Sequence, residues 1–253
     1  MKTSNVKIAA IIPARMASAR LPGKPLLEIE GLPMIEHVRR RVLLSGAFSD
    51  VVVATCDREI AEVVEKNGGR VMMTSIAHKV ATERIVEAMQ NLDCTHVMNV
   101  QGDEILVLPG DLAQMAEAIR ANPSGASVWN AIARITEPKD LMDTAIVKCV
   151  VSKTDRLLFC SRKFLFSESV FQVVGILAYQ RKFLEEFSKL NQTPLELLES
   201  VEQSRILEHD MTIQGVRFEK GYPGINTPVE AETVKLILKE DPIQRSILLS
   251  LRA

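Results

Sequence analysis

The first half of the chain alternates between short apolar runs and amphipathic stretches, and this alternation constrains the fold most. The apolar runs predict strands at residues 6–12, 51–55, 70–73 and 96–100, and helical spacing predicts helices at 33–44, 57–66 and 82–92. Because the connections are short, each strand is expected to pair in parallel through a helical crossover. The pattern therefore predicts an α/β fold with a doubly wound, mostly parallel sheet. We expect Pro13 to end the first strand and Asp57 to cap the second helix.

The second half of the chain is less regular. Strands are predicted at residues 127–134, 145–151, 156–160 and 172–179 and near 212–218, and helices at 194–207 and 228–239. No linker, low-complexity tract or internal repeat separates the two halves. We therefore expect a single domain over residues 1–253, with an inserted antiparallel region at approximately 125–220.

The composition excludes several classes of function. The chain has 31 Lys and Arg residues against 32 Asp and Glu, a net charge of −1, so nothing draws it generically to nucleic acid. Aromatic residues make up only 4% of the chain, which disfavours a stacking surface for single-stranded nucleic acid. No apolar run approaches the roughly 18 residues that a membrane span needs, and the N-terminus shows no signal-peptide pattern.

The four cysteines are far apart in the sequence and form no CxxC pair; they are Cys56, Cys94, Cys149 and Cys160. This spacing disfavours a zinc site and a disulfide framework. Reduced thiols are typical of the cytoplasm, and we expect the protein to be cytoplasmic.

The loop at residues 13–25 carries three cations at the exit of the first predicted strand. Ligands of doubly wound sheets bind beyond the carboxyl ends of the strands, which selects this loop together with residues 74–84 and 101–104. A cationic loop is more often a solvated surface, but this one follows a buried strand and has no acidic neighbours. Its cations are Arg15, Arg20 and Lys24, with Ser18 and Gly23 between them. The loop predicts a polyphosphate pocket that is neither a Walker A loop nor a dinucleotide fingerprint.

The other two selected segments add a carboxylate and a helix start. Asp103 follows the strand predicted at 96–100 and, opposite a phosphate loop, is a natural ligand for Mg²⁺. Alternatively, Gly102 and Asp103 form a simple turn. Thr82 and Arg84 lie at a predicted helix start, where free N–H groups favour anions. Alternatively, this is an ordinary capped helix with Arg84 on its surface.

Taken together, these segments resemble the 3-deoxy-manno-octulosonate cytidylyltransferases, the CMP-Kdo synthetase family. The resemblance extends over roughly residues 6–235 and is densest in the first 104. The motifs that carry it are IIPARxxSxRLPGKP at 11–25, GxPMIxHV at 31–38, VATxD at 53–57, GGxVxMT at 68–74, NVQGDE at 99–104 and a PGxxTP segment at 223–228 followed by Glu232.

The resemblance implies a nucleotidyltransferase fold and the reaction of CTP with a 2-keto-3-deoxy sugar acid, with Mg²⁺, to give a CMP-sugar acid and pyrophosphate. It implies a role in cell-surface polysaccharide synthesis and a homodimer formed through the inserted region. The implied catalytic residues are Arg15, Lys24 and Asp103; the CTP-binding residues are Arg15, Ser18, Arg20, Lys24, Thr82, Arg84 and Gln101. The implied acceptor-binding residues are Gln101, Arg162, Tyr179 and Gln203, and the metal ligands are Asp103 and Asn226.

The chain departs from the family pattern mainly where the acceptor should bind. Asn226 replaces an aspartate of the family, which keeps an oxygen but removes a charge. Gln172, Val173 and Leu177 replace an arginine, a histidine and a tyrosine. Two interpretations follow: the enzyme activates a modified acid or a phosphonate, or it is a catalytically weakened nucleotide-binding subunit. The intact phosphate loop and Asp103 favour an active enzyme, and the absence of a DxD motif disfavours a glycosyltransferase of similar fold.

Overall fold

The computed structural model describes residues 6–18, 20–163 and 170–252. The chain divides into two compact units: Met1–Ala116 with Tyr222–Ala253 form unit 1, and Glu117–Gly221 form unit 2. The organisation as one domain with an insertion at about 125–220 stays a prediction.

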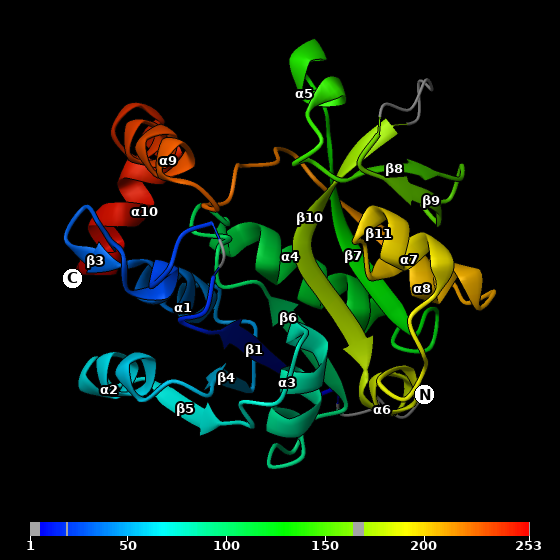
Figure 1. Cartoon of the computed structure of the whole chain (residues 1–253), viewed down its shortest axis with the longest axis horizontal. Coiled ribbons are helices and arrows are strands. Elements are labelled where there is room, and N and C mark those ends of the chain that lie inside the picture. Colours follow the sequence, from blue (N-terminus) through cyan, green and yellow to red (C-terminus); the bar gives the residue numbers. More distant parts are fainter. Residues whose placement is uncertain (1–5, 19, 164–169, 253) are drawn as a thin grey trace. The chain divides into compact units, whose positions relative to one another are not determined.

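Unit 1 contains the strands that were predicted from the first half of the sequence (Figure 1). They are β1 (Ile8–Ala14), β4 (Asp50–Thr55), β5 (Arg70–Met73) and β6 (His96–Val100). Their order is β6-β1-β4-β5, and every neighbouring pair in this group is parallel. The prediction of a parallel α/β sheet is therefore confirmed for this unit.

The helices of the first half follow the same pattern. They are α1 (Met34–Leu44), α2 (Arg58–Lys66), α3 (Ala81–Met89) and α4 (Pro109–Ala121), and the short elements η1 (Lys24–Leu26), β2 (Glu28–Ile29) and β3 (Leu32–Pro33) precede α1. The first three helices match predicted ones within a few residues. Helix α4 was not predicted. Among the described residues, no helix combines the length and the apolar character that a membrane crossing requires.

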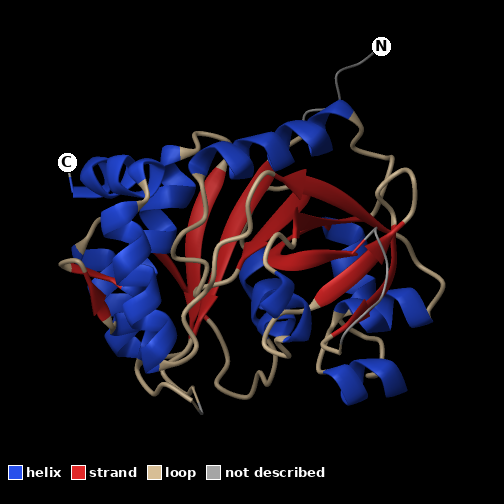
Figure 2. Ribbon diagram, turned by 90° about the horizontal axis from the view of Figure 1, so that it is seen from above, coloured by secondary structure: helices blue, strands red, loops and turns tan. Residues whose placement is uncertain are grey.

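The last part of the chain returns to unit 1 as two helices that pack together near the C-terminus, α9 (Pro228–Glu240) and α10 (Pro242–Arg252) (Figure 2). An apolar cluster attaches them to the rest of the unit. Val234 and Leu238 of α9 lie in it with Ile105 and Leu106, which follow β6, and with Ile225. Burial of these side chains fixes the segment just before α9 next to the loop after β6.

One local prediction in unit 1 was wrong, and a second is confirmed in position only. Strand β1 does not stop at Pro13 but continues through it to Ala14. The pairing of β1 with β6 ends at Ile11, so the missing N–H of Pro13 removes no bond from that side of the ladder. Asp57 is the N-cap residue of α2, as predicted, but its side chain forms no cap hydrogen bond and instead accepts from the N–H of Met16.

Unit 2 is built around antiparallel pairs. Its strands are β7 (Val128–Arg134), β8 (Lys148–Val151), β9 (Leu157–Ser161), β10 (Val170–Gln180) and β11 (Ile213–Phe218). Strand β10 pairs antiparallel with β7 and β8, β8 pairs antiparallel with β9, and β7 pairs parallel with β11. The register of β10 against β7 shifts between Val173 and Leu177. The strands predicted here are thus confirmed, with small differences at their ends.

The helices of unit 2 are short: α5 (Pro138–Met142), α6 (Arg181–Phe187), α7 (Pro194–Glu199) and α8 (Gln203–Glu208). The single helix predicted at 194–207 is in fact α7 and α8. The break lies at Ser200, which has a left-handed φ of 53° and so ends α7.

Candidate functional site

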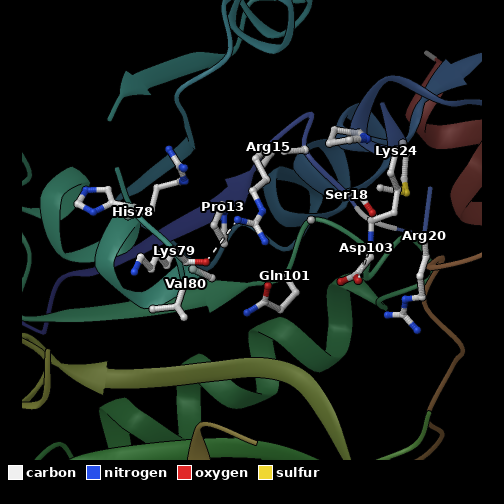
Figure 3. A pocket seen from close by; sticks show the side chains of 17 residues that line it. Pro13, Arg15, Ser18, Arg20, Lys24, His78, Lys79, Val80, Gln101 and Asp103 are labelled. Carbon is white, nitrogen blue, oxygen red and sulfur yellow. Dashed lines mark hydrogen bonds and ion pairs between the residues drawn. The ribbon is translucent and has the colours of Figure 1, made fainter. Parts of the chain in front are cut away.

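A cavity of about 490 Å³ lies in unit 1, beyond the carboxyl ends of β1 and β6 (Figure 3). Its lining consists of Pro13, Ala14, Arg15, Ala17, Ser18, Arg20, Lys24, Pro25, Met34, His78, Lys79, Val80, Ala81, Arg84, Gln101, Gly102 and Asp103. The three segments selected from the sequence all contribute to it. The position is the one that the general rule for parallel α/β sheets predicts.

A backbone hydrogen bond between its two ends closes the loop after β1. The N–H of Gly23 donates to the carbonyl of Met16 at 3.1 Å, and Gly23 takes a φ of +72°, which favours glycine. The short helix η1 then begins at Lys24, with Pro25 in its first turn. The closed loop presents Arg15, Arg20 and Lys24 to the cavity.

Lys24 lies between two oxygen atoms that come from distant parts of the chain. Its Nζ donates to Oδ2 of Asp103 at 2.8 Å and to Oδ1 of Asn226 at 3.1 Å. The side chains of Lys24 and Asp103 are 15% and 26% exposed, so the pair stands at the cavity wall and not in bulk solvent. Figure 3 shows Asp103 between Gln101 and Arg20 in this view.

Close backbone packing brings Asp103 and Asn226 together. A Cβ on Gly102 would lie 2.9 Å from the carbonyl oxygen of Pro13, so glycine lets the loop after β6 approach the end of β1. On the other side, the N–H of Ile225 donates to the carbonyl of Asp103 at 3.4 Å. Because Ile225 is buried in the apolar cluster, the position of Asn226 is fixed by the core.

The start of α3 forms another wall of the cavity. Arg15 donates from Nη1 to the carbonyl of Lys79 at 3.3 Å. Arg84 is buried and donates to Oγ1 of Thr74 and, at 3.4 Å, to Sγ of Cys56. The alternative that placed Arg84 on the surface is therefore wrong. Thr82 is also buried, and it is not among the described lining residues.

Glu87 holds the segment that leads into α3. Its Oε2 accepts from the N–H of Ser75 at 2.8 Å and also bonds Nε2 of His78. The hydrogen bond from Ser75 is the main reason that the pKa of Glu87 is lowered, with His78 contributing. Because His78 lines the cavity, its bond to the carboxylate of Glu87 helps to fix the shape of this wall.

The acceptor residues suggested in unit 2 have partners inside that unit. The guanidinium of Arg162 donates to the backbone carbonyls of Thr144, Ala145 and Glu199 at 3.2, 3.0 and 3.0 Å. These bonds hold the turn after β9, and they use donors that a ligand would need.

Gln203 and Tyr179 are buried. Gln203 donates to Oδ1 of Asn130 at 2.9 Å, and Asn130 in turn donates to the carbonyls of Val174 and Ile176 at the register shift of β10. Tyr179 stacks on Phe183 with ring centroids 6.4 Å apart. Both side chains thus contribute to the packing of unit 2.

Asp57 shapes the site in a way that was not predicted from the sequence. Asp57 accepts from the N–H of Met16 at 2.7 Å and so holds the loop after β1 next to the segment that follows β4. The residue type and its place before a helix indicated a cap, and nothing local in the sequence distinguishes the two roles.

The charge of the cavity favours an anion. Five cations line it (Arg15, Arg20, Lys24, Lys79 and Arg84), and Asp103 is the one carboxylate among the described lining residues. The guanidinium group of arginine and the ammonium group of lysine are the usual partners of phosphate oxygens.

Two side-chain oxygens of this site could hold a divalent metal ion. Oδ2 of Asp103 and Oδ1 of Asn226 converge on a single ammonium group, as they would on a cation. Within the described ranges, no group of three or more His, Cys, Asp or Glu residues is arranged to hold a metal. A metal here would rest on one carboxylate, one amide oxygen and the oxygens of a bound phosphate, which is a set that Mg²⁺ accepts.

Comparisons with known proteins agree with this geometry. The model of the cytidylyltransferase family matches residues 9–213. A 3-deoxy-manno-octulosonate cytidylyltransferase of Geobacter metallireducens is 38% identical over 248 residues, covering 90% of this chain and 96% of its own. One of Escherichia coli is 34% identical and covers 93% of this chain and 97% of its own.

A solved structure shares the fold. It is that of a CMP:2-keto-3-deoxy-manno-octonic acid synthetase complexed with CTP, with a TM-score of 0.87 and 33% identity, and it covers 93% of this chain and 99% of its own. The predicted fold class, an α/β fold of the nucleotidyltransferase type, is thereby confirmed. The family model and these relatives together show that the chain belongs to the cytidylyltransferase family, within it to the 3-deoxy-manno-octulosonate cytidylyltransferases.

Proposed function

We propose that this enzyme transfers CMP from CTP to the anomeric hydroxyl of a 2-keto-3-deoxy sugar acid and releases pyrophosphate. The acceptor is 3-deoxy-manno-octulosonate (Kdo) or a modified analogue, and the product serves cell-surface polysaccharide synthesis. The observation that carries the proposal is the cationic cavity at the carboxyl ends of β1 and β6, in which five cations face one carboxylate. The names of the relatives and the CTP complex of the solved structure support the choice of nucleotide and acceptor.

Transfer of this kind needs positioning and charge neutralisation more than covalent work by the protein. In our proposal Arg15, Arg20 and Lys24 bind the triphosphate from the loop after β1. Arg15 and Lys24 stabilise the charge that grows on the leaving pyrophosphate. Ser18 adds a hydroxyl donor, and buried Arg84 adds a fixed positive charge from the wall.

Mg²⁺ would be held by Asp103 and Asn226, whose oxygens converge on Lys24. When bound, the metal neutralises charge on the phosphates and polarises the reacting phosphoryl group. Gln101 lines the cavity beside Asp103 and would contact the nucleotide or the acceptor.

We assign no binding role to Thr82, because it is not among the described residues that line the cavity. Arg162, Tyr179 and Gln203 are also left out, since their polar or aromatic groups are engaged within unit 2. The homodimer and the location in the cytoplasm stay predictions.

The test is a pyrophosphate-release assay with CTP, Mg²⁺ and a panel of 2-keto-3-deoxy acids and phosphonates. We expect release that depends on a sugar acid, with a CMP-sugar acid as the second product. Release with ATP or GTP at the same rate would contradict the assignment of the nucleotide. Binding of CTP without turnover of any acid would support a catalytically weakened subunit instead.

A further inference from the structure

Lys24 occupies the place where a cation would bind between Asp103 and Asn226. Its ammonium lies 2.8 Å from the carboxylate and 3.1 Å from the amide oxygen, and its side chain is largely buried. An ammonium group at these distances gives both oxygens a hydrogen bond and neutralises the carboxylate. The two oxygens therefore have a cationic partner that the chain itself supplies.

The surroundings disfavour replacing that partner with a free divalent ion. Asp103 is the single carboxylate among the described lining residues, and four further cations share the same wall. Asn226 contributes an oxygen but no charge. A divalent ion entering alone would have to displace Lys24 and bring two positive charges into a region that is already positive.

The two oxygens are held in place by the backbone. Ile225 donates to the carbonyl of Asp103, and a Cβ on Gly224 would lie 3.1 Å from that same oxygen. The N–H of Asn226 is bound by Oε2 of Glu230 at 2.6 Å, which directs that carboxylate to the backbone. The side chain of Lys24, which has four flexible bonds, is then the part of the group that can move.

A bound triphosphate changes this balance. Its negative oxygens are a stronger counter-ion for Lys24 than Asp103 alone. They also supply the negative charge that a divalent ion needs around it. We propose that Lys24 is a resident counter-ion, which moves to the phosphates when nucleotide binds, so that the divalent metal enters this site only together with nucleotide. This proposal rests on the assignment of CTP as substrate. It adds that the metal does not bind before the nucleotide, and that Lys24 has a second role as counter-ion to Asp103.

Binding of Mn²⁺ to the nucleotide-free protein tests the proposal without turnover. Free Mn²⁺ is measured by electron paramagnetic resonance for the wild-type protein and for Lys24→Met, Asn226→Asp and Asp103→Asn. We expect Lys24→Met and Asn226→Asp to bind one Mn²⁺ at least about tenfold more tightly than wild type, a typical size for coupling between sites. Lys24→Met combined with Asp103→Asn should lose that site, and Lys66→Met, on the exposed end of α2, should behave as wild type.

A second measurement follows the metal when CTP is present and no acceptor is added. The wild-type protein should give a Mn²⁺ signal distinct from that of Mn²⁺ and CTP in buffer, and Asp103→Asn should abolish the difference. Nucleotide-free wild type that binds Mn²⁺ as tightly as Lys24→Met would overturn the proposal, as would Lys24→Met that binds no Mn²⁺ although it is folded by circular dichroism. A failure of the pyrophosphate assay leaves these results unchanged, so the two proposals fail separately.

Discussion

The carboxylate of Asp57 accepts a hydrogen bond from the backbone N–H of Met16 at 2.7 Å. The carbonyl of the same Met16 accepts from Gly23, so this one residue closes the loop and also receives its anchor. Asp57 lies two residues beyond the end of β4, and it leaves the N-terminus of α2 without a side-chain cap. Asp57 therefore fixes the shape of the cationic loop and does not cap α2 with its side chain.

Asp57→Ala should therefore weaken CTP binding without removing any group that lines the cavity. The lost bond involves a charged acceptor, for which about 1.5–3 kcal/mol is typical, so we expect at least about a tenfold increase in Kd. Calorimetry gives the affinity, and hydrogen exchange should show faster exchange in residues 15–24. Glu59→Ala, in the exposed first turn of α2, is the matched control. Unchanged affinity and exchange would mean that the loop keeps its shape unaided.

Arg15→Ala and Lys24→Ala should each lower turnover by about 10²-fold or more. Both groups line the cavity in which we propose that charge develops on the leaving pyrophosphate, and removal of such a group typically has an effect of this size. Steady-state rates of pyrophosphate release measure the effect, with Lys66→Ala as the control for loss of a surface cation. Variants that stay within a few-fold of wild type would show that the loop is a surface feature.

We expect the stability that Glu87 contributes to depend on pH. Because its pKa is lowered below the ordinary value of 4.5, chiefly by the hydrogen bond from Ser75, it stabilises the fold above that value. The stabilisation is lost as the pH falls through the lowered pKa. We expect Glu87→Gln to unfold more easily than wild type at neutral pH, and the difference to vanish in acid. Urea unfolding at a series of pH values measures this, with Glu65→Gln on α2 as control, and a difference that is constant with pH would contradict it.

The elements predicted best were those with an unambiguous local pattern. Strands β5 and β6 agree residue for residue with residues 70–73 and 96–100, because each is a short run with clear stops. The position of the cavity was also predicted, because ligands of a parallel sheet bind beyond the carboxyl ends of its strands.

What escaped prediction depends on contacts between distant residues. Lys24 meets Asn226 across 202 positions in the sequence; the resemblance placed both in one site, but their direct hydrogen bond depends on the packing of α9 and Ile225 in the core. Gln203 was expected to reach a ligand but bonds Asn130, a partner 73 positions away. The residue type was consistent with either role, and tertiary packing decided between them.

The cysteines should differ sharply in reactivity. Burial raises the pKa of Cys149 to about 12 and also raises the pKa of Cys160, which lies opposite it in the β8–β9 pair. Cys56 is only half-buried and accepts a bond from Arg84, a residue of the cavity wall. A thiol reagent applied to the folded protein should therefore label Cys56 first, and CTP should slow the labelling. Mass spectrometry of the labelled peptides identifies the site, and early labelling of Cys149 would contradict the prediction.

We expect the acceptor preference to depend on β10. Gln172, Val173 and Leu177 stand where the family pattern has an arginine, a histidine and a tyrosine, so polar groups suited to a hydroxylated acid are missing. The structure leaves Gln172 and Val173 half-buried and Leu177 buried, and the Gln172 side chain fills the space where a Cβ on Gly221 would be. An apolar wall tolerates a methyl or acyl substituent better than it rewards a hydroxyl.

We therefore expect a modified sugar acid to exceed Kdo in kcat/KM by tenfold or more, which corresponds to about 1.4 kcal/mol. Val173→His should raise kcat/KM for Kdo and leave the modified acid unchanged or worse, because it returns one polar partner to the strand. Val170→His, at the start of the same strand, controls for the added imidazole. Initial rates with both acids measure the ratio. Equal kcat/KM for Kdo and for every modified acid would show that the replacements on β10 do not set the specificity.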